Sequence, residues 1–384
     1  MKKKTFIMGI IGVLLLMQSI SAQIWQGTKR LTWNSGESYS PAIAVGPNNH
    51  IHVVWDDVTP GNREIYYKRS TNGGTTWTTK RMTYSVANTV YSNIAVDSNN
   101  HIHVVWIDAT PLNWEIFYRE STDGGDTWNG AKRLTWNAGN SYYPSVAVNS
   151  SSRVNVVWSD NTPGNYEIYY KRSTDGGATW PGTKRLTWNI GGSFHPTIAV
   201  NSTNNIHVTW NDDSYDSNNE IYYKRSIDGG ATWLKYKRLT QNAGDSRSPV
   251  IAMGSSNAIH IVWYDETFII PEIFYRRSTD GGKTWDSVRR LTWNAGNSEY
   301  PVIAVDTSSR IHVAWQDNSP GSNEIYYKRS INGGTTWSKY KRITWNSGFS
   351  ANPAIAVDSS NNIHLVWEDV TPGNFEIYYK KGIQ

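Results

Sequence analysis

Residues 50–84 read HIHVVWDDVTPGNREIYYKRSTNGGTTWTTKRMTY, and the parts of this stretch return throughout the chain. Its most regular element is Trp-x-Asp, which occurs seven times at spacings of 51, 52, 52, 53, 52 and 52 residues. The tryptophans of this element are Trp55, Trp106, Trp158, Trp210, Trp263, Trp315 and Trp367. A fixed period in this range indicates a solenoid, a propeller or another repeat array.

Each unit contains four short runs with strand character, which in the first unit are residues 41–45, 50–55, 64–70 and 77–84. Turn residues separate these runs, and no helical period is present. Four strands per repeat are typical of the blades of a β-propeller, which normally has about four to eight of them. We therefore predict an all-β, seven-bladed β-propeller of four-stranded blades. An open solenoid of seven units is the alternative.

The two ends of the chain favour a closed ring. The last unit stops at residues 381–384, where earlier units continue into a turn and a fourth strand. Residues 25–33, WQGTKRLTW, match residues 180–188, WPGTKRLTW, which lie at a fourth-strand position. We expect the strand at 23–34 to complete blade seven together with residues 351–384, which removes the open edges of a linear array.

Residues 1–22 have the three parts of a secretory signal: a lysine run, an apolar stretch over 6–17, and small residues before a cleavage point. An uncleaved anchor is the alternative, although the apolar stretch is short for a bilayer. We predict a signal peptide at 1–22, a propeller domain at 23–384, and a secreted or periplasmic bacterial protein that leaves the membrane after cleavage.

Composition excludes several classes of protein. The 384 residues include no cysteine, so neither disulfides nor a cysteine–zinc site hold the fold together. The net charge of +5 falls to +2 without Lys2, Lys3 and Lys4 of the leader, since 34 basic residues then face 32 acidic ones. Nucleic acid and anionic membranes require a concentrated basic face, so we expect neither as a partner.

Nineteen of the twenty tryptophans lie at repeated positions, and we interpret all nineteen as packing residues. Seven belong to Trp-x-Asp. Six follow a Gly-Gly turn, and Trp25 is the displaced seventh of that set. The remaining five end the fourth strands: Trp33, Trp136, Trp188, Trp293 and Trp345. Only Trp114 has no counterpart in another unit.

The turn Ser-x-Asp/Asn-Gly-Gly-x-Thr-Trp occurs six times, ending at Trp77, Trp128, Trp180, Trp233, Trp285 and Trp337. It resembles the Asp-box, or BNR repeat, of sialidase-like β-propellers, and the resemblance covers essentially all of residues 23–384. The resemblance implies a turn between the third and fourth strands, on the face away from an active site. Within the turn, the Asp or Asn side chain is expected to accept hydrogen bonds from main-chain amides.

The resemblance to the sialidase enzymes ends where their chemistry would lie. Those enzymes bind a carboxylate with three arginines and use a tyrosine nucleophile with a glutamate, together with an aspartic acid. On the loops opposite the Asp-boxes we find only Arg63 and Arg247. Glu299 and Tyr300 are adjacent, so in a strand they would point apart. We predict no catalytic residue, and an exo-sialidase-like glycoside hydrolase is the alternative.

Repeated ionisable residues are expected to be structural. Every unit has an Asp/Glu pair, such as Asp57 and Glu64, whereas a glycosidase needs one pair. Histidine occupies one second-strand position in six units and Asn155 occupies it in the other. Packed sheets lie too far apart for these histidines to share an ion. We expect no metal and no cofactor, with calcium in the Asp loops as the alternative.

The units differ mainly before the first strand and after Trp-x-Asp. The paired residues before the first strands are 39–40, 90–91, 142–143, 194–195, 247–248, 299–300 and 351–352. Aromatic, hydroxyl and charged side chains around a channel mouth suit a sugar or a peptide. Drift in exposed loops would produce similar variation. The candidate ligand-binding residues are Tyr39, Trp114, Tyr143, His195, Tyr215, Arg247, Phe268 and Tyr300.

Together these patterns predict a secreted, non-catalytic binding or scaffolding propeller. The expected ligand is an extracellular glycan or an extracellular protein, bound on the face opposite the Asp-boxes. We expect the protein to be a monomer.

Overall fold

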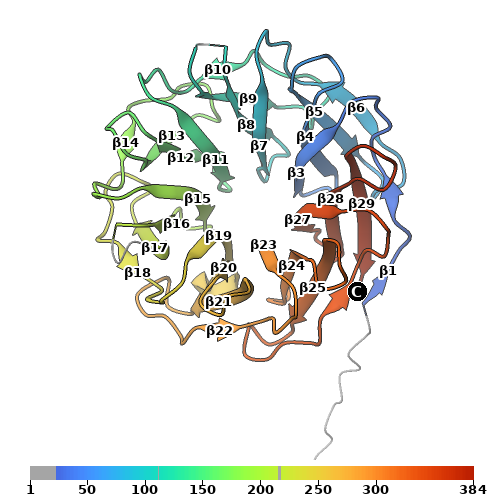
Figure 1. Cartoon of the computed structure of the whole chain (residues 1–384). Helices are drawn as coiled ribbons and strands as arrows, with labels where there is room; N and C mark the ends of the chain where they lie inside the picture. The colour runs from blue at the N-terminus through green and yellow to red at the C-terminus, as the bar shows by residue number, and fades with distance from the viewer. Residues whose placement is uncertain (1–22, 111, 215–217) are drawn as a thin grey trace, which may run out of the picture.

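The computed structural model describes residues 23–110, 112–214 and 218–384. Seven antiparallel sheets are arranged around a central channel, as Figure 1 shows. Each sheet is one blade, and its strands run outward in chain order except in blade seven, whose outer strands come from the N-terminal end of the described chain. The predicted all-β, seven-bladed propeller is therefore confirmed. Among the described residues, the only helix is the single 3-10 turn η1 (Ser255–Asn257).

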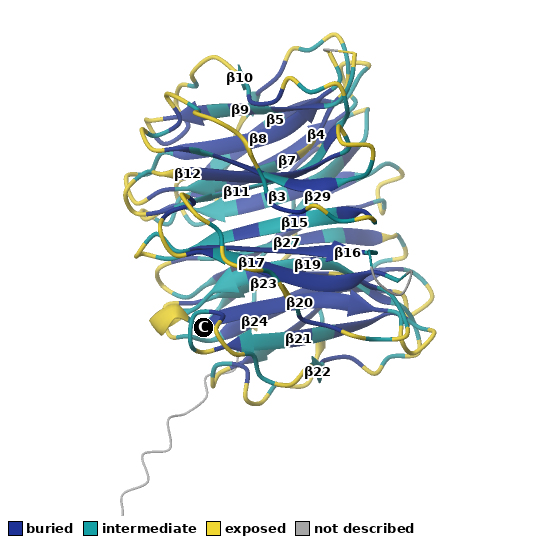
Figure 2. Cartoon of the chain, turned by 90° about the vertical axis from the view of Figure 1, so that its left-hand side faces the viewer, coloured by how far each residue is buried: buried dark blue, intermediate teal, exposed yellow. Residues whose placement is uncertain are grey.

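The strand bounds repeat from blade to blade. The innermost strands are β3 (Ser38–Val45), β7 (Thr89–Val96), β11 (Ser141–Val148), β15 (Ser193–Val200), β19 (Ser246–Met253), β23 (Ser298–Val305) and β27 (Ser350–Val357). The second strands are β4 (Ile51–Asp57), β8 (Ile102–Asp108), β12 (Val154–Asp160), β16 (Ile206–Asp212), β20 (Ile259–Asp265), β24 (Ile311–Asp317) and β28 (Ile363–Asp369). In Figure 2 the second strands form the buried layer of the ring.

The third strands are β5 (Glu64–Ser70), β9 (Glu115–Ser121), β13 (Glu167–Ser173), β17 (Glu220–Ser226), β21 (Glu272–Ser278), β25 (Glu324–Ser330) and β29 (Glu376–Ile383). The outermost strands are short: β6 (Thr78–Arg81), β10 (Lys132–Arg133), β14 (Lys184–Arg185), β18 (Lys237–Arg238), β22 (Arg289–Arg290) and β26 (Lys341–Arg342). They are shorter than the predicted run of 77–84, because the chain past each Lys-Arg or Arg-Arg pair makes only isolated ladder bonds, such as that from Met82 N to Ile65 O at 2.7 Å.

The N-terminal segment closes the ring, as the sequence predicted. Strands β1 (Ile24–Trp25) and β2 (Lys29–Arg30) both pair with β29 of blade seven. The register places Trp25 opposite Gly382 and Lys29 opposite Tyr379. Figure 1 accordingly shows the C-terminus beside β1. Because residues from both ends share one sheet, blade seven has no missing outer strand.

Neighbouring blades are joined by one repeated aromatic contact. In blade one, the hydroxyl of Tyr67 shares a hydrogen bond of 2.7 Å with Nδ1 of the buried His52. The box tryptophan of the next blade, Trp128, packs edge-on against the Tyr67 ring with centroids 5.0 Å apart. Gly125 of the same box has φ +95°, and a Cβ there would lie 2.1 Å from the Tyr67 hydroxyl oxygen. The second box glycine is therefore required by both its backbone conformation and this close approach.

The Asp-box has the internal bonding expected of it. In the third blade, Asp175 accepts hydrogen bonds from Ser173 Oγ at 2.6 Å and from Thr179 N at 2.9 Å. These bonds, with the Ser173 bond foremost, hold the pKa of the Asp175 carboxyl down at about 2. The box is thus a locally bonded turn whose tryptophan faces the neighbouring blade.

The repeated Asp/Glu pairs also have structural partners. Asp57 accepts hydrogen bonds from Ser38 Oγ, Trp55 Nε1 and Thr59 N at 2.9 to 3.2 Å, which tie the loop after the second strand to the blade. Glu64 forms an ion pair of 3.1 Å with Arg81 of the fourth strand. Within the described residues, no group of three or more His, Cys, Asp or Glu side chains is arranged to hold a metal ion.

The predicted signal peptide lies outside the described residues, so it stays a prediction. Within the part of the chain that the structure describes, no helix is long and apolar enough to cross a membrane.

Ring closure can be tested at Trp25, whose ring packs on Tyr327 with centroids 5.1 Å apart, as each box tryptophan packs on its tyrosine. Trp25→Ala should cost about 3 to 5 kcal/mol of unfolding free energy because it leaves a cavity between blades six and seven. Deletion of residues 23–34 should cause aggregation, because β29 becomes an open edge. Chemical denaturation and size-exclusion chromatography measure the two effects.

Trp33→Gln is the matched control, since Trp33 lies in the same segment but its side chain is 67% exposed. Its effect on the free energy of unfolding should stay within about 0.5 kcal/mol. A deletion variant that remains monomeric with an unchanged melting temperature would contradict closure.

The buried histidines predict how stability depends on pH. Burial lowers the pKa of His52 to about 3 and the pKa values of His207 and His260 to about 4, from an ordinary 6.5. The unfolded chain therefore takes up protons below pH 6.5 that the folded chain does not. Each histidine contributes stability that is complete above pH 6.5 and is lost as the pH falls toward 4, by up to about 1.4 kcal/mol per pH unit.

Asn155 supplies the control for this prediction, because it occupies the same position in blade three and accepts a hydrogen bond of 2.8 Å from Tyr170. The triple variant His52→Asn, His207→Asn, His260→Asn should lose stability less steeply than the parent protein between pH 6.5 and 4. Urea midpoints measured across that range test the prediction, and identical slopes would disprove it.

Candidate functional site

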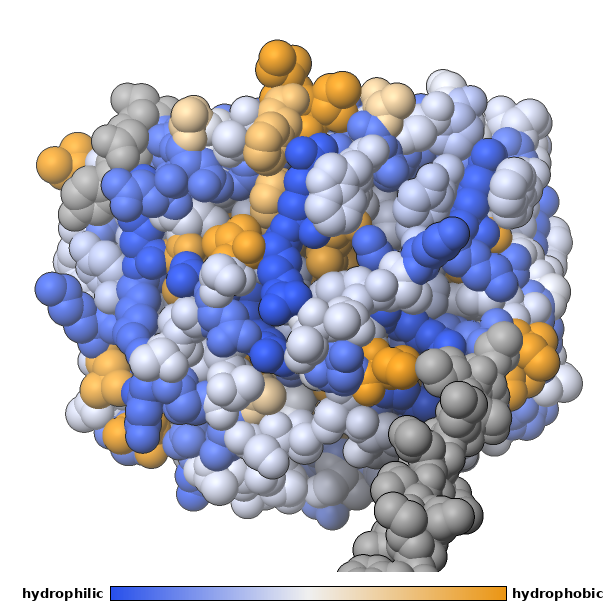
Figure 3. All heavy atoms as spheres, turned by 90° about the horizontal axis from the view of Figure 1, so that it is seen from below, coloured by the Kyte–Doolittle hydropathy of each residue, from blue (hydrophilic) through white to orange (hydrophobic). Residues whose placement is uncertain are grey.

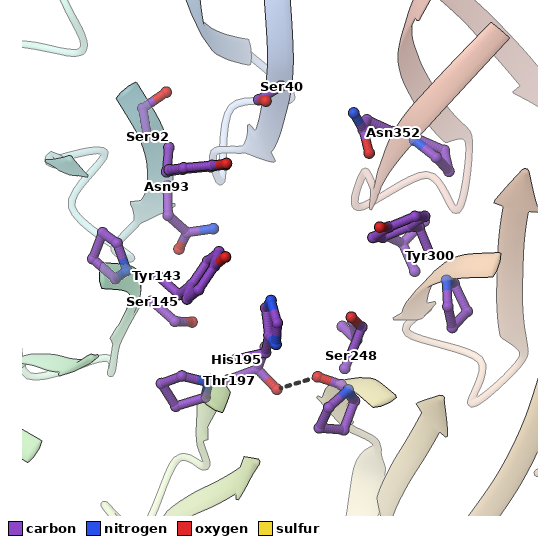
Figure 4. Close-up of a pocket in the computed structure, with 18 of the residues that line it drawn as sticks. Ser40, Ser92, Asn93, Tyr143, Ser145, His195, Thr197, Ser248, Tyr300 and Asn352 are labelled. Carbon is purple, nitrogen blue, oxygen red and sulfur yellow. Dashed lines mark hydrogen bonds between the residues drawn. The ribbon is translucent and has the colours of Figure 1, made fainter. Parts of the chain in front are cut away.

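A cavity of about 470 Å³ opens at one end of the central channel. It lies where the innermost strands begin, so the Asp-box turns, which follow the third strands, are at the opposite end. Figure 4 shows side chains from separate strands converging on this space. One residue of each blade holds the same place around it: Ser40, Tyr91, Tyr143, His195, Ser248, Tyr300 and Asn352. We call these seven residues the channel ring.

A β-bulge turns the channel ring toward the axis. In blade one, Tyr39 pairs with Asp56 and Ala42 pairs with Val54, so Ser40 and its proline lie opposite a single residue. Every ring residue has a left-handed backbone with φ between 47° and 54°. This conformation costs an L-residue about 1 kcal/mol or more. The following residue is proline in six blades, which the bulge tolerates because that position needs no ladder N–H.

A second set of variable side chains supports the ring from behind. These are the middle residues of Trp-x-Asp, all 8% exposed or less: Asp56, Ile107, Ser159, Asn211, Tyr264, Gln316 and Glu368. Glu368 Oε2 accepts a hydrogen bond of 2.7 Å from Ser40 N, and Gln316 Oε1 accepts one of 3.2 Å from Asn352 N. In both cases the acceptor belongs to the preceding blade. The side chains that vary are thus coupled across blade boundaries.

The channel ring is electrically neutral near pH 7. Burial lowers the pKa of His195 below its ordinary value, and Nδ1 of its ring lies 3.3 Å from Asn211 Oδ1. Burial raises the pKa of Tyr143 to about 12 and also raises that of Tyr300. The cavity therefore offers hydroxyl, amide and imidazole groups rather than charges to a ligand.

Two carboxyl groups lie behind this neutral lining, Asp56 in blade one and Glu368 in blade seven. Burial raises the pKa of Asp56 to about 7, although Arg63 lies 3.2 Å from its carboxylate. Burial also raises the pKa of Glu368. Both side chains are 5% exposed or less, and Glu368 accepts a hydrogen bond from the main-chain amide of Ser40 in the channel ring. This arrangement makes Glu368 a support of the channel wall.

Three aromatic rings form a continuous surface on one side of the cavity. Tyr91 and Tyr143 have centroids 5.4 Å apart, and Tyr143 and His195 have centroids 4.1 Å apart. They come from the neighbouring blades two, three and four. Tyr300 approaches from blade six and contacts Tyr264 at 5.7 Å. Such a surface can stack against the apolar face of a sugar while the serine and asparagine side chains bond its hydroxyls.

Comparison with known protein families agrees with the repeated blade architecture. Residues 64–313, well over half of the chain, match the BNR repeat-like domain. The chain belongs to this family. As a BNR propeller it resembles the xyloglucanase Xgh74A of Acetivibrio thermocellus, with 24% identity over 290 residues that cover 64% of this chain and 31% of that protein. The BNR propeller thus spans about a third of the length of this relative.

Solved structures show the same fold. A polysaccharide lyase of family PL25, an ulvan lyase, superimposes with a TM-score of 0.66 at 10% identity, covering 91% of this chain and 95% of that chain. The NanB sialidase of Streptococcus pneumoniae superimposes with a TM-score of 0.51 at 13% identity, covering 92% of this chain and 70% of that chain. The BNR propeller is therefore sialidase-like in fold and related to proteins that act on glycans.

The structure brings three of the predicted ligand residues together. Tyr143, His195 and Tyr300 belong to the channel ring, on three different blades. Tyr215 lies outside the described residues. The ring also contains Tyr91 and Asn352, which were noticed as variable but were not chosen as candidates.

The other four predicted ligand residues lie away from the lining of this cavity. The Tyr39 hydroxyl donates to Glu37, and its ring lies under Arg63 at 4.5 Å. Arg247 forms an ion pair of 2.7 Å with Asp245. Trp114 packs on Tyr142, and Phe268 lies parallel to Phe274 with centroids 6.3 Å apart.

The interpretation of all repeated tryptophans as packing residues is wrong for one set. Trp-x-Asp tryptophans are at most 1% exposed, and the box tryptophans pack on tyrosines. The fourth-strand tryptophans instead lie at the surface: Trp33 is 67% exposed, Trp136 65%, Trp188 66%, Trp293 66% and Trp345 76%. Their strand is the outermost one of each blade, so no further sheet covers them.

Proposed function

We propose that this BNR propeller is a secreted, non-catalytic binding protein whose channel ring takes uncharged sugar units of an extracellular glycan. The observation that carries the proposal is the aromatic surface of Tyr91, Tyr143 and His195 facing serine and asparagine across a cavity of about 470 Å³. That volume falls within the range of about 300 to 1,000 Å³ typical of small-ligand sites. The xyloglucanase and the lyase named above act on polysaccharides, which supports a glycan over a protein ligand.

The same residues favour binding over sialidase chemistry. A sialoside carries a carboxylate that needs a cationic clamp, and the described residues that line the cavity include no arginine or lysine. Tyr300 lies in the cavity, whereas its neighbour Glu299 is directed to Gln316 behind the wall. A tyrosine nucleophile would therefore lack an adjacent base at this position.

The proposal can be tested with residues 23–384 on a glycan array, followed by calorimetry with the glycans that bind. Tyr143→Ser and His195→Ser should each weaken binding by about 1 to 3 kcal/mol, because they remove stacking surface. Serine is suitable because Ser40 and Ser248 already occupy the equivalent bulge position with the same backbone conformation. Binding should also be nearly the same at about pH 7.5 as at about pH 8.5, because burial lowers the pKa of His195 from its ordinary value of 6.5 and the imidazole is neutral at these pH values.

Phe268→Ala is the control, since Phe268 lies outside the cavity lining and is 52% exposed. It should leave glycan binding unchanged. The glycans that bind and a fluorogenic sialoside should also be incubated with the protein and examined for products. Turnover that is lost in His195→Ser or Arg247→Ala would contradict a non-catalytic role, and unchanged binding in both serine variants would remove the channel ring as the site.

A further inference from the structure

The exposed tryptophans lie in grooves between blades, on the outer side of the ring. One groove, of about 500 Å³, is lined by Trp188 of blade three together with Lys224 and Trp233 of blade four. An equivalent groove of about 460 Å³ is lined by Trp293, Lys328 and Trp337, between blades five and six. Figure 3 shows a side of the ring, where strongly hydrophilic side chains alternate with pale and apolar ones. The grooves are separate from the channel cavity.

The basic residue that the next blade places beside the end of each fourth strand depends on whether that strand ends in tryptophan. Where the fourth strand ends in tryptophan, the third strand of the next blade supplies a lysine: Trp33 with Lys68, Trp136 with Lys171, Trp188 with Lys224, Trp293 with Lys328 and Trp345 with Lys380. At the other two boundaries the fourth strand ends in Tyr84 or Gln241, and the next blade supplies Arg119 or Arg276. We call the two kinds Trp–Lys grooves and Arg grooves.

The arginine closes its groove, and the lysine leaves its groove open. Arg119 donates to Met82 O of the preceding blade at 2.5 Å and to Asn129 O of its own blade at 2.6 Å, so it bridges both walls. Among the described residues, Lys224 donates to one acceptor, Leu186 O of the preceding blade, at 2.7 Å. An ammonium group has three N–H donors, so two remain for a ligand.

Three of these lysines also lack an ion-pair partner among the described residues. The arginine beside each tryptophan is balanced by a buried glutamate, as Arg290 is by Glu272 at 2.6 Å. In the described chain no carboxylate forms an ion pair with Lys171, Lys224 or Lys328, although each ammonium lies within 5.5 Å of its tryptophan ring centroid. Burial lowers the pKa of each of these lysines. In these three grooves an exposed indole therefore lies beside the ammonium group of a lysine that is 7 to 9% exposed and has no ion-pair partner among the described residues.

We propose that the five Trp–Lys grooves are binding sites for an acidic polysaccharide, one sugar unit to each groove. The indole offers a flat surface for the sugar ring, and the lysine offers its free donors to a carboxylate or sulfate. A chain of repeating acidic sugars matches a set of repeating sites. Binding through several grooves at once raises the overall affinity well above that of one groove. This inference is independent of the glycan proposed for the channel ring.

The test uses residues 23–384 with polygalacturonate and dextran sulfate as acidic probes and dextran as the neutral probe, in affinity electrophoresis. One variant replaces all five groove tryptophans with glutamine: Trp33→Gln, Trp136→Gln, Trp188→Gln, Trp293→Gln and Trp345→Gln. Glutamine is chosen because this chain carries Gln241 at the equivalent place. This variant should bind the acidic probes at least about tenfold more weakly, with an unchanged circular dichroism spectrum. Single Trp→Gln variants, each expected to reduce binding by a smaller step, serve if the fivefold variant does not fold.

The decisive variant changes all five lysines to arginine: Lys68→Arg, Lys171→Arg, Lys224→Arg, Lys328→Arg and Lys380→Arg. It keeps the net charge while copying the basic residue of the closed Arg grooves. Loss of binding to the acidic probes would support the grooves, whereas full retention would show attraction by charge alone and overturn the proposal. Equal binding of dextran, or no binding of either acidic probe, would also overturn it. Tyr143→Ser should leave binding of the acidic probes intact, which separates failure here from failure at the channel ring.

Discussion

The contact on which the rest of the structure depends is the one between a third-strand tyrosine and the Asp-box of the next blade. The tyrosine hydroxyl is bound to a buried histidine or asparagine within its own blade, and the neighbour's box tryptophan covers its ring. The box glycine is required because the hydroxyl occupies the space of a Cβ. Each blade thus completes the packing of the one before it. A ring of such contacts is complete only if the N-terminal segment supplies the seventh tryptophan, as Trp25 does against Tyr327.

Because the Asp-box end of each blade carries these contacts between blades, the residues at the opposite end of the channel can vary. The strained bulge is kept in all seven blades, whereas the side chain on it changes from serine to tyrosine, histidine or asparagine. The supporting residue changes as well: Glu368 holds Ser40, and Gln316 holds Asn352. Since backbone strain persists only where the surroundings enforce it, the repeated bulge is a scaffold feature and the varied side chains provide the asymmetry that a ligand site needs.

The fold could be predicted from the sequence because the motifs that specify it recur at a nearly fixed spacing. The 52-residue spacing, the box turns and the displaced Trp25 each specified a blade position, and the structure confirms them. The site was harder to predict, because a bulge reverses which of two adjacent residues faces the channel. Tyr39 was chosen where Ser40 lines the cavity, whereas Tyr143 and His195, also chosen as candidates, do line it. The proline after most ring residues was the available signal, since proline within a strand indicates a bulge.

Repetition was also a poor guide to burial. Trp55 and Trp33 both recur around the ring, yet one is 1% exposed and the other 67%. Position within the blade decides the difference, because the second strand is covered on both faces and the fourth strand ends the sheet. The pairing of Trp33 with Lys68, and of Gln241 with Arg276, crosses a blade boundary, so it becomes meaningful only once the blades are placed side by side.

The order of the grooves around the ring limits how a polymer could use them. Following the blades, the grooves of Trp136 and Trp188 are adjacent, and those of Trp293, Trp345 and Trp33 are adjacent, while the closed grooves of Arg119 and Arg276 separate the two groups. A polysaccharide following the side of the ring would therefore meet a pair of sites or a group of three. The channel ring has neutral groups and occurs once, whereas the Trp–Lys grooves are cationic and repeated. Specific recognition of one sugar suits the first arrangement, and retention on an extended acidic polymer suits the second.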